Sequence, residues 1–343
     1  MKQTAVVILN WNGKDLLERF LPALLRYTPS SEADIIVVDN GSTDESVAFL
    51  KSHYPEIELQ VFPKNYGFAE GYNRALVGLH YKYVVILNSD VEVSDAWLTS
   101  AVRYLDEHPE VTALQPKILS CRKPLHFEYA GACGGFIDKN AYPFCRGRIF
   151  NVIEKDCGQY DKAIPVFWTS GACLFIRLQA YKEVGGFDEQ FFAHQEEIDL
   201  CWRLNARGHQ LVCFPQSVVY HLGAATLKKE NPQKTYLNFR NNLLMIYKNL
   251  SSKYYRRMMF SRWYCDYLAA LHFVLKGQIA NALAVVKARR DFRKMKSKYN
   301  TIRMHNLKLT QNDIPATVWR KSLIWEFYFR NQKTYSDINQ SVK

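Results

Sequence analysis

Residues 5–13 read AVVILNWNG, five apolar residues followed directly by a polar turn. Three more apolar runs in the first ninety residues end in the same way, at residues 35–38, 59–62 and 83–87. Short apolar runs bounded by turn residues are typical of strands that are buried on both faces of a sheet. Each run is therefore predicted to be a buried strand.

Helical patterns separate these runs. Between the first two runs, apolar side chains recur every three or four residues, at Leu16, Leu17, Phe20, Leu21, Leu24 and Leu25. Residues 71–80 predict another helix before the fourth run. The alternation of strand and helix favours an α/β fold, with a mostly parallel sheet flanked by crossover helices.

Every predicted strand ends in a polar cluster. The clusters are Asn10-Trp11-Asn12, Asp39-Asn40-Gly41-Ser42, Lys64-Asn65-Tyr66-Gly67 and Asn88-Ser89-Asp90. Open parallel sheets bind ligands outside the carboxyl ends of their strands. Such residues also serve as turn and helix-cap residues, which explains one cluster well. Four aligned clusters favour a binding site.

The second half of the chain changes character twice. Residues 116–165 are rich in Gly and Pro without a sustained period, and predict a loop-rich or short-stranded insertion. An apolar run follows at 172–176, and then a helix from about Gln195 that Gly208 would end. From Tyr236 the pattern is helical, aromatic and basic. We expect two domains, residues 1–235 and a helical C-terminal extension, residues 236–343.

Charge divides the chain at nearly the same place. Residues 240–343 hold 21 Lys and Arg against 5 Asp and Glu, whereas residues 1–239 hold 24 against 28. The extension thus carries +16 and the rest of the chain −4. A strongly basic segment attracts an anionic partner, either a membrane surface or nucleic acid.

Composition and absent motifs exclude several classes of protein. With 48% apolar and 23% charged residues, the chain is expected to be globular rather than disordered. The first strand is followed by Asn-Trp-Asn-Gly and not by the glycine fingerprint of nicotinamide-dependent oxidoreductases, and the chain lacks the P-loop of NTPases. None of the eight cysteines forms a Cys-x-x-Cys pair, so reduced, cytosolic thiols are expected.

No targeting or spanning segment is expected. The first apolar run is too short for a signal-peptide core, and no stretch reaches the roughly 18 uninterrupted apolar residues of a spanning helix. The sequence therefore predicts a cytoplasmic protein whose contact with a membrane would be peripheral.

Two strand-end carboxylates suit nucleotide binding. Asp90, with Asn88 two residues before it, could ligate a hard divalent cation whose other ligands are diphosphate oxygens and water. Asp39 could accept a hydrogen bond from the ring N3-H of uracil or thymine. Turn and cap roles remain open for both residues.

Three carboxylates open the helix predicted from Gln195. Glu196 and Asp199 share one face, and Glu197 points about a quarter turn away, so one carboxylate is available as a general base. Helix stability alone would explain one or two of them, because acidic residues suit a helix N-terminus. Asp199 can pair with Arg203 one turn later.

His221 follows an apolar run and could be a late metal ligand or a structural histidine.

In sequence order, these motifs resemble those of bacterial family 2 glycosyltransferases of the GT-A fold, especially the rhamnosyltransferase-like branch. The resemblance spans residues 6 to about 244. It rests on VILNWNG (7–13), VVDNGSTD (37–44), NYGFAEGYN (65–73), LNSD (87–90), SGA (170–172), GGFDE (185–189) and the Glu-Glu-x-Asp helix (196–199).

The resemblance implies roles for particular residues. Asp39 would contact the pyrimidine, Asp90 would be the metal ligand of a DxD-type motif, and His221 would be a second metal ligand. Glu197 corresponds to the catalytic base. The chain departs from the family at Asn88, where Asp is usual, and at Glu196-Glu197, where Glu-Asp is usual. These departures leave open the metal affinity and which of Glu196, Glu197 and Asp199 is the base.

The resemblance also implies an inverting transfer that depends on Mn²⁺ or Mg²⁺. The donor would be a UDP- or dTDP-sugar, and the acceptor a glycan or polyprenol-linked hydroxyl in cell-surface polysaccharide synthesis. The residues predicted to bind substrate are Asn10, Asn12, Asp39, Asn65, Gly67, Asn73, Asn88, Ser89, Ser170, Gly171 and Gly186. The alternative is a basic nucleic-acid-binding protein or a non-catalytic nucleotide-sugar-binding protein.

The basic extension leaves two interpretations open. Apolar and aromatic residues alternate between basic blocks in residues 263–286, which fits an interfacial helix pair on anionic lipid better than a grip on nucleic acid. An ordinary packed helical hairpin with a solvated basic face fits equally well. No nucleic acid partner is expected.

Overall fold

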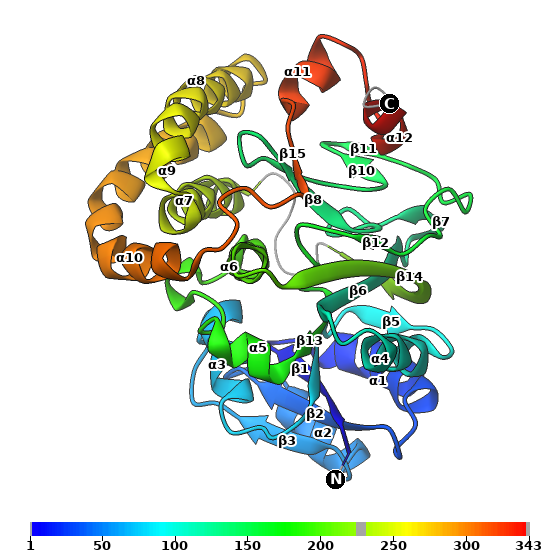
Figure 1. The fold of residues 1–343 in the computed structure, drawn as a ribbon. Helices are drawn as coiled ribbons and strands as arrows, with labels where there is room; N and C mark the ends of the chain where they lie inside the picture. Colours follow the sequence, from blue (N-terminus) through cyan, green and yellow to red (C-terminus); the bar gives the residue numbers. More distant parts are fainter. Residues whose placement is uncertain (1, 224–230, 341–343) are drawn as a thin grey trace.

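A ten-stranded mixed sheet forms the centre of the protein (Figure 1). The computed structural model describes residues 2–223 and 231–340. The strands of this sheet are β1 (Thr4–Asn10), β2 (Ala33–Asp39), β3 (Glu58–Val61), β4 (Tyr83–Asn88), β5 (Val91–Val93), β6 (Val111–Ser120), β7 (Lys123–Phe127), β12 (Ile164–Pro165), β13 (Cys173–Arg177) and β14 (Gln210–His221).

The four strands predicted first are confirmed as β1 to β4, paired in parallel in the order β4-β1-β2-β3. Register aligns their carboxyl ends, because Asn10 pairs with Asp39 across β1 and β2, and Leu9 pairs with Asn88 across β1 and β4. On the other side of β4 the sheet continues through β13, which is antiparallel to both β4 and β6. The polar clusters therefore meet at one edge.

Helices cover both faces of the sheet. On one face α1 (Lys14–Tyr27), α2 (Ser46–His53) and α4 (Trp97–Glu107) pack with Val6 and Ile8 of β1. On the opposite face α3 (Gly67–Leu76), α5 (Leu178–Glu183) and α6 (Glu196–Ala206) pack with Ala5 and Val7. Adjacent strand residues thus point into different cores, which explains why the strands are continuously apolar.

The insertion predicted at 116–165 builds a second, five-stranded sheet in the order β11-β10-β9-β8-β15. Its strands are short, as the Gly and Pro content of the insertion indicates: β8 (Gly135–Asp138), β9 (Pro143–Cys145), β10 (Arg148–Ile149), β11 (Val152–Ile153) and β15 (Val318–Trp319). The last strand comes from the C-terminal extension and pairs in parallel with β8.

The extension is helical, as predicted, and wraps back onto the rest of the molecule (Figure 1). Its helices are α7 (Pro232–Asn249), α8 (Ser252–Leu275), α9 (Ile279–Met295), α10 (Asn300–Leu309), α11 (Leu323–Tyr328) and α12 (Tyr335–Gln340), with a 3-10 turn η2 (Lys296–Tyr299). The side chains of residues 243–246 in α7 are fully buried in the same core as α3, α5 and α6. The division at 235 stays a prediction.

Within residues 2–223 and 231–340, no helix is both long and apolar enough to cross a membrane. All eight cysteines lie in these ranges and none takes part in a disulfide.

Candidate active site

The ends of β1 and β2 form the first part of the site. Asn10 and Asp39 are both fully buried, and Asn10 Nδ2 donates to Asp39 Oδ2 at 3.1 Å. The other Asp39 oxygen accepts from the Ser42 backbone N–H at 2.8 Å, which fixes the turn that follows β2. Within the described chain, Asn10 Oδ1 is buried without a hydrogen-bond partner. This oxygen is an acceptor that a ligand could satisfy.

The neighbouring turns are tied together by amides. Asn12 has a φ of 49°, and its Oδ1 accepts from the Thr43 backbone N–H at 2.7 Å. Asn40 donates to Asn65 Oδ1 and to the Gly67 carbonyl. It is not among the predicted site residues. Gly67 has a φ of +77°, and a Cβ there would lie 2.6 Å from the Phe192 ring. Only glycine fits this turn.

Asp90 and His221 lie together at the end of β14. His221 pairs with Val91 in the β5–β14 ladder, and its Nε2 is 3.0 Å from Asp90 Oδ1. The Asn88 amide is 3.5 Å from the same ring nitrogen. Ser89 separates Asn88 from Asp90 at the end of β4. The structure therefore brings the predicted metal ligands into contact.

Glu128 is the third member of this group, and no local sequence pattern predicts it there. Its Oε2 lies 3.3 Å from His221 Nδ1, an ion-pair distance that falls outside hydrogen-bond geometry. Burial lowers the pKa of His221, but the Asp90 and Glu128 carboxylates outweigh burial and raise it to about 10. A carboxylate behind a histidine is the usual arrangement around a metal-ligating imidazole.

Asp90 and His221 fit a divalent cation whose remaining ligands come from a bound phosphate and from water. Two ligands that are adjacent on an octahedral ion with bonds of about 2.1 Å lie about 3 Å apart, which is the separation of Asp90 Oδ1 and His221 Nε2. Among the described residues no group of three or more His, Cys, Asp and Glu could by itself hold a metal ion. Mg²⁺-type sites commonly take one or two protein ligands and complete the shell with phosphate oxygens and water.

Residues 170–172 connect the strand ends to helix α6. The Asn88 backbone N–H donates to the Ala172 carbonyl at 3.0 Å. Ser170 is buried, and its Oγ donates to the Ala130 carbonyl at 2.5 Å. A Cβ added to Gly171 would lie 3.8 Å from Glu197 Cβ. The turn therefore places Glu197 against the edge where the polar clusters meet.

Glu196 and Glu197 have backbone hydrogen bonds but no ion-pair partner among the described residues. Across the described residues, Oε2 of each is buried and makes no hydrogen bond. Burial raises the pKa of Glu197 to about 7. Burial and the neighbouring Glu197 charge raise the pKa of Glu196 well above its usual value. Glu197 as a whole residue is partly exposed, whereas Glu196 is buried.

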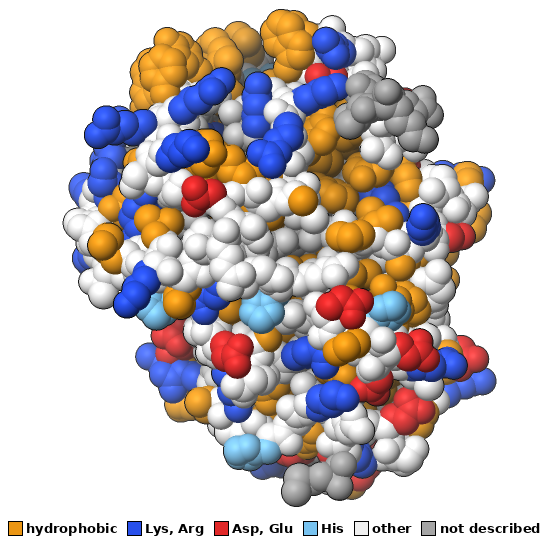
Figure 2. All heavy atoms as spheres, viewed as in Figure 1, with side chains coloured by type: hydrophobic (Ala, Val, Ile, Leu, Met, Phe, Trp, Pro, Cys, Tyr) orange, Lys and Arg blue, Asp and Glu red, His pale blue; other side chains and the backbone are white. Residues whose placement is uncertain are grey.

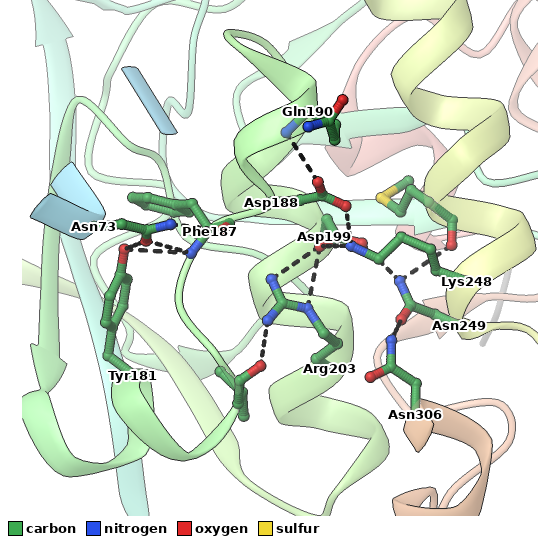
Figure 3. A network of polar contacts seen from close by, with 12 residues as sticks. Asn73, Tyr181, Phe187, Asp188, Gln190, Asp199, Arg203, Lys248, Asn249 and Asn306 are labelled. Atoms are coloured by element: carbon green, nitrogen blue, oxygen red, sulfur yellow. Dashed lines mark hydrogen bonds and ion pairs between the residues drawn. The ribbon is translucent and has the colours of Figure 1, made fainter. Parts of the chain in front are cut away.

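Asp199 has structural partners on both oxygens (Figure 3). Its Oδ2 accepts from Arg203 Nη2 at 2.9 Å and from Lys248 Nζ at 2.9 Å, and its Oδ1 accepts from Asn249 Nδ2 at 2.8 Å. Burial would raise the pKa of Asp199, but the charges of Lys248 and Arg203 outweigh it and lower the pKa. Lys248 also binds Asp188 at 2.5 Å. Sequence patterns could not reveal Lys248, because its partners lie far away along the chain.

Asn73 organises the loop before α6 (Figure 3). Its Nδ2 donates to the Phe187 carbonyl at 2.9 Å, and its Oδ1 accepts from the Phe187 N–H at 2.9 Å and from Tyr181 Oη at 2.6 Å. Gly186 has a φ of +65°, and a Cβ there would meet Asn73 Oδ1 at 2.5 Å. Contacts of Asn73 and Gly186 with substrate stay predictions.

A strained segment leads into α6. Phe192, His194 and Gln195 all have φ between 64° and 72°, which non-glycine residues rarely adopt. Asn241 of α7 holds this segment, because its Nδ2 lies within hydrogen-bond distance of the carbonyls of residues 191, 193 and 194, at 3.1, 3.0 and 2.7 Å. Outliers of this kind persist where the surrounding structure fixes them, and they cluster at functional sites.

Comparison with known proteins identifies the family. Residues 5–166 match Glycosyl transferase family 2. The N-acetylglucosaminyl-diphospho-decaprenol L-rhamnosyltransferase of Mycobacterium tuberculosis is 30% identical over 237 residues, which cover 63% of this chain and 75% of that protein. The rhamnosyltransferase WbbL of Escherichia coli is 22% identical over 223 residues, 63% of this chain and 82% of that protein.

Solved structures share the fold at low identity. S. aureus TarS 1-349 in complex with UDP-GlcNAc has a TM-score of 0.56 at 15% identity, over 98% of this chain and 93% of that one. The mannosyltransferase PcManGT from Pyrobaculum calidifontis, in complex with GDP-Man and Mn²⁺, has a TM-score of 0.52 at 14% identity, over 90% of this chain and 86% of that one. The fold is thus of the GT-A type, and the chain belongs to glycosyl transferase family 2 and is a glycosyltransferase.

Proposed function

We propose that the protein transfers a sugar with inversion from a nucleotide-sugar, favouring a UDP- or dTDP-sugar, to a hydroxyl group of a glycan or a polyprenol-linked acceptor in cell-surface polysaccharide synthesis. The observation that carries the proposal is Glu197. Its Oε2 has no hydrogen-bond partner within the described ranges, its pKa is raised to about 7, and it faces Gly171 beside the strand-end cluster. A general base works best when its pKa is near the operating pH.

Glu197 is proposed to remove the acceptor proton while the anomeric carbon is attacked from the face opposite the nucleotide. A positioned base of this kind is worth about 10²- to 10⁴-fold in rate. Glu196 is buried, and burial together with the Glu197 charge raises its pKa well above its usual value, which favours its protonated form. Asp199 is engaged by two cations and an amide, which suits it to holding α6 in place.

Asp90 and His221 are proposed to hold Mn²⁺ or Mg²⁺, with Glu128 orienting the imidazole. The bound cation would neutralise the charge of the departing nucleotide diphosphate. Asn88 replaces the usual aspartate, so the protein supplies one carboxylate fewer and relies more on the donor diphosphate. Structures of the same fold that contain Mn²⁺ together with a nucleotide or nucleotide-sugar support this assignment.

The nucleotide is proposed to lie along the ends of β1 and β2. Asp39 is held by Asn10 and by the Ser42 N–H, and its carboxylate is proposed to accept a hydrogen bond from a pyrimidine N3–H. Asn12, Asn65 and Gly67 shape the turns on either side. The relative named for a decaprenol-linked substrate supports a polyprenol-linked acceptor for this chain.

A donor screen tests the proposal. UDP-, GDP- and dTDP-sugars with Mn²⁺ are added in turn, and the sugar that binds raises the melting temperature by mass action. Titration of UDP with Mn²⁺ by calorimetry then compares Asp39→Asn and Asp90→Asn with Asp95→Asn, an exposed control in the loop after β5. Unchanged affinity in both strand-end variants would disprove the assignment of the donor site.

A further inference from the structure

The helical hairpin of α8 and α9 has an unusual distribution of polarity. The two helices are joined by a short turn at residues 276–278 and pack together through Ala270, Ala282 and Val285. Their inward sides carry charge: Arg262 Nη2 binds Asp266 Oδ1 at 2.9 Å, and Arg289 binds the other Asp266 oxygen. All three charged side chains are buried.

The outward side of α8 is apolar instead. Phe260, Tyr264, Leu268, Leu271 and Leu275 are spaced by four, four, three and four residues, so they lie on one face of the helix. They are between 52% and 78% exposed. A surface helix of a water-soluble protein normally has the opposite arrangement, with apolar residues inside and charged residues outside. The outer face of α8 is therefore suited to an apolar environment.

The apolar face continues onto α9 and has a basic border. Ile279, Leu283 and Val286 of α9 are exposed at the end of the hairpin near the turn. The opposite end of the hairpin carries exposed cations on both helices, at Arg256, Arg257, Arg290, Arg293 and Lys294. Apolar side chains thus gather toward the turn, and most of the exposed cations lie away from it, although exposed Lys276 lies in the turn itself.

Helix α11 extends the same surface. Its Trp325 and Tyr328 and the following Phe329 are more than half exposed. Figure 2 shows hydrophobic side chains along the upper end of the molecule, over α8 and α11 of Figure 1, with Lys and Arg side chains in a row beneath them. We call the exposed apolar side chains of α8, α9 and α11 the apolar rim.

We propose that the apolar rim docks on the surface of a bilayer that contains anionic lipids. Leucine and aromatic side chains enter the boundary between headgroups and acyl chains, and the cations behind them contact lipid phosphates. The long Lys and Arg side chains can extend along the apolar surface while their charges stay at headgroup level. This surface goes beyond the proposed transfer reaction and does not depend on it.

The charges favour lipid over two other occupants. A second copy of this chain would bring together two segments that each carry +16, which repel one another. Nucleic acid would attract the cations, but the exposed Leu268, Leu271 and Leu275 cannot stack on bases as aromatic side chains do. An anionic bilayer satisfies both the apolar side chains and the cations.

Vesicle flotation of the full-length protein tests the proposal. The vesicles are phosphatidylcholine alone or mixed with phosphatidylglycerol, and no donor is present. We expect the wild type to float with the anionic vesicles. Leu268→Glu/Leu271→Glu should weaken partitioning by at least about tenfold, because it places charge in the inserted face. The matched control Val77→Glu/Leu125→Glu changes two apolar residues elsewhere that are at least as exposed, and it should bind like wild type.

A second variant tests the cations. Arg290→Gln/Arg293→Gln should reduce binding to anionic vesicles and lessen its sensitivity to salt. Thermal melts verify that every variant is folded. The proposal is overturned if the wild type stays unbound with anionic vesicles, or if the control loses binding as the Leu268/Leu271 variant does. It is also overturned if that variant only converts a dimer to a monomer, or only loses binding to duplex DNA.

Discussion

Glu196 and Glu197, two adjacent carboxylates at the start of α6, differ in burial. A helix N-terminus favours ionised carboxylates, yet burial outweighs this and raises the pKa of both Glu196 and Glu197. The Glu197 charge also contributes to the raised pKa of Glu196. Each of the two charges disfavours the other, so ionisation of one carboxylate favours the protonated form of its neighbour. The pair can supply one base near neutral pH.

Glu197→Gln should lower turnover by about 10²-fold or more and leave nucleotide affinity nearly unchanged, because it removes basicity and keeps the shape of the side chain. Steady-state kinetics and calorimetry with UDP and Mn²⁺ separate the two effects. Glu196→Gln and Asp199→Asn serve as comparisons. If Glu197→Gln retains near-normal transfer and one of the comparisons abolishes it, the base is another member of the motif.

The raised pKa of Glu197 also predicts two pH dependences. The rate should fall about tenfold per pH unit below about pH 7, where the base is protonated. Stability has the opposite dependence on pH. Between the pKa of Glu197 in the unfolded chain and its pKa of about 7 in the folded chain, the folded state binds more protons than the unfolded state, so the free energy of unfolding falls as pH rises. Glu197→Gln should therefore stabilise the fold at pH 8, on the order of 1 to 3 kcal/mol, and not at pH 4. Urea melts at both pH values measure this difference.

Glu128 should matter for metal binding although it does not adjoin the proposed metal position. Glu128→Gln removes the charge behind His221 and should weaken Mn²⁺ affinity in the presence of UDP by about 10- to 100-fold. Titration of Mn²⁺ into the protein with UDP measures it. Glu92→Gln alters an exposed carboxylate on β5 and is the matched control. Equal Mn²⁺ affinity in the two variants would rule out a role for Glu128.

At the scale of elements, α7 fixes the approach to α6. Asn241 donates toward three carbonyls of the strained segment, and Asn242 donates to Gln195, the residue that precedes α6. Arg262 of α8 in turn donates to Asn242. A continuous polar chain therefore runs from the hairpin to the helix that carries Glu197.

Asn241→Asp tests this contact because it keeps the side-chain shape and replaces the donor by an acceptor that faces three carbonyls. We expect a loss of about 2 kcal/mol or more in stability and a larger fall in kcat than in UDP affinity. Gln233→Ala, at an exposed position of the same helix, is the control. Unchanged kcat in a stable Asn241→Asp protein would show that the segment does not depend on α7.

Helices and strands could be predicted from the sequence better than contacts between residues that are distant in the chain. Strands β1 to β4 follow from local apolar runs, and their register alone brings Asn10, Asp39 and Asn88 to one edge. The antiparallel position of β13 and the placement of Glu128 depend on pairing between distant segments, which no local pattern records. Likewise Lys248 lies 49 residues from Asp199, so its ion pair could not be read from helical spacing.

At the scale of the whole molecule, the C-terminal extension packs into the core of residues 1–235. Residues 243–246 of α7 are fully buried in the core that contains α3, α5 and α6. Lys248 and Asn249 neutralise and bind the buried Asp199. Strand β15 adds an edge to the second sheet, and the Leu323 N–H donates to the buried Asp138 at 2.8 Å.

A fragment of residues 1–235 should therefore not fold independently. It lacks the four buried apolar side chains of residues 243–246, which contribute about 6 to 12 kcal/mol at about 1.5 to 3 kcal/mol each, as much as the net stability of a typical protein. It also leaves Asp199 without Lys248, and breaking a buried ion pair costs about 3 to 5 kcal/mol. Near-UV circular dichroism and thermal melts compare the fragment with the full chain. A cooperative melt and UDP binding by the fragment would instead establish residues 1–235 as an independent domain.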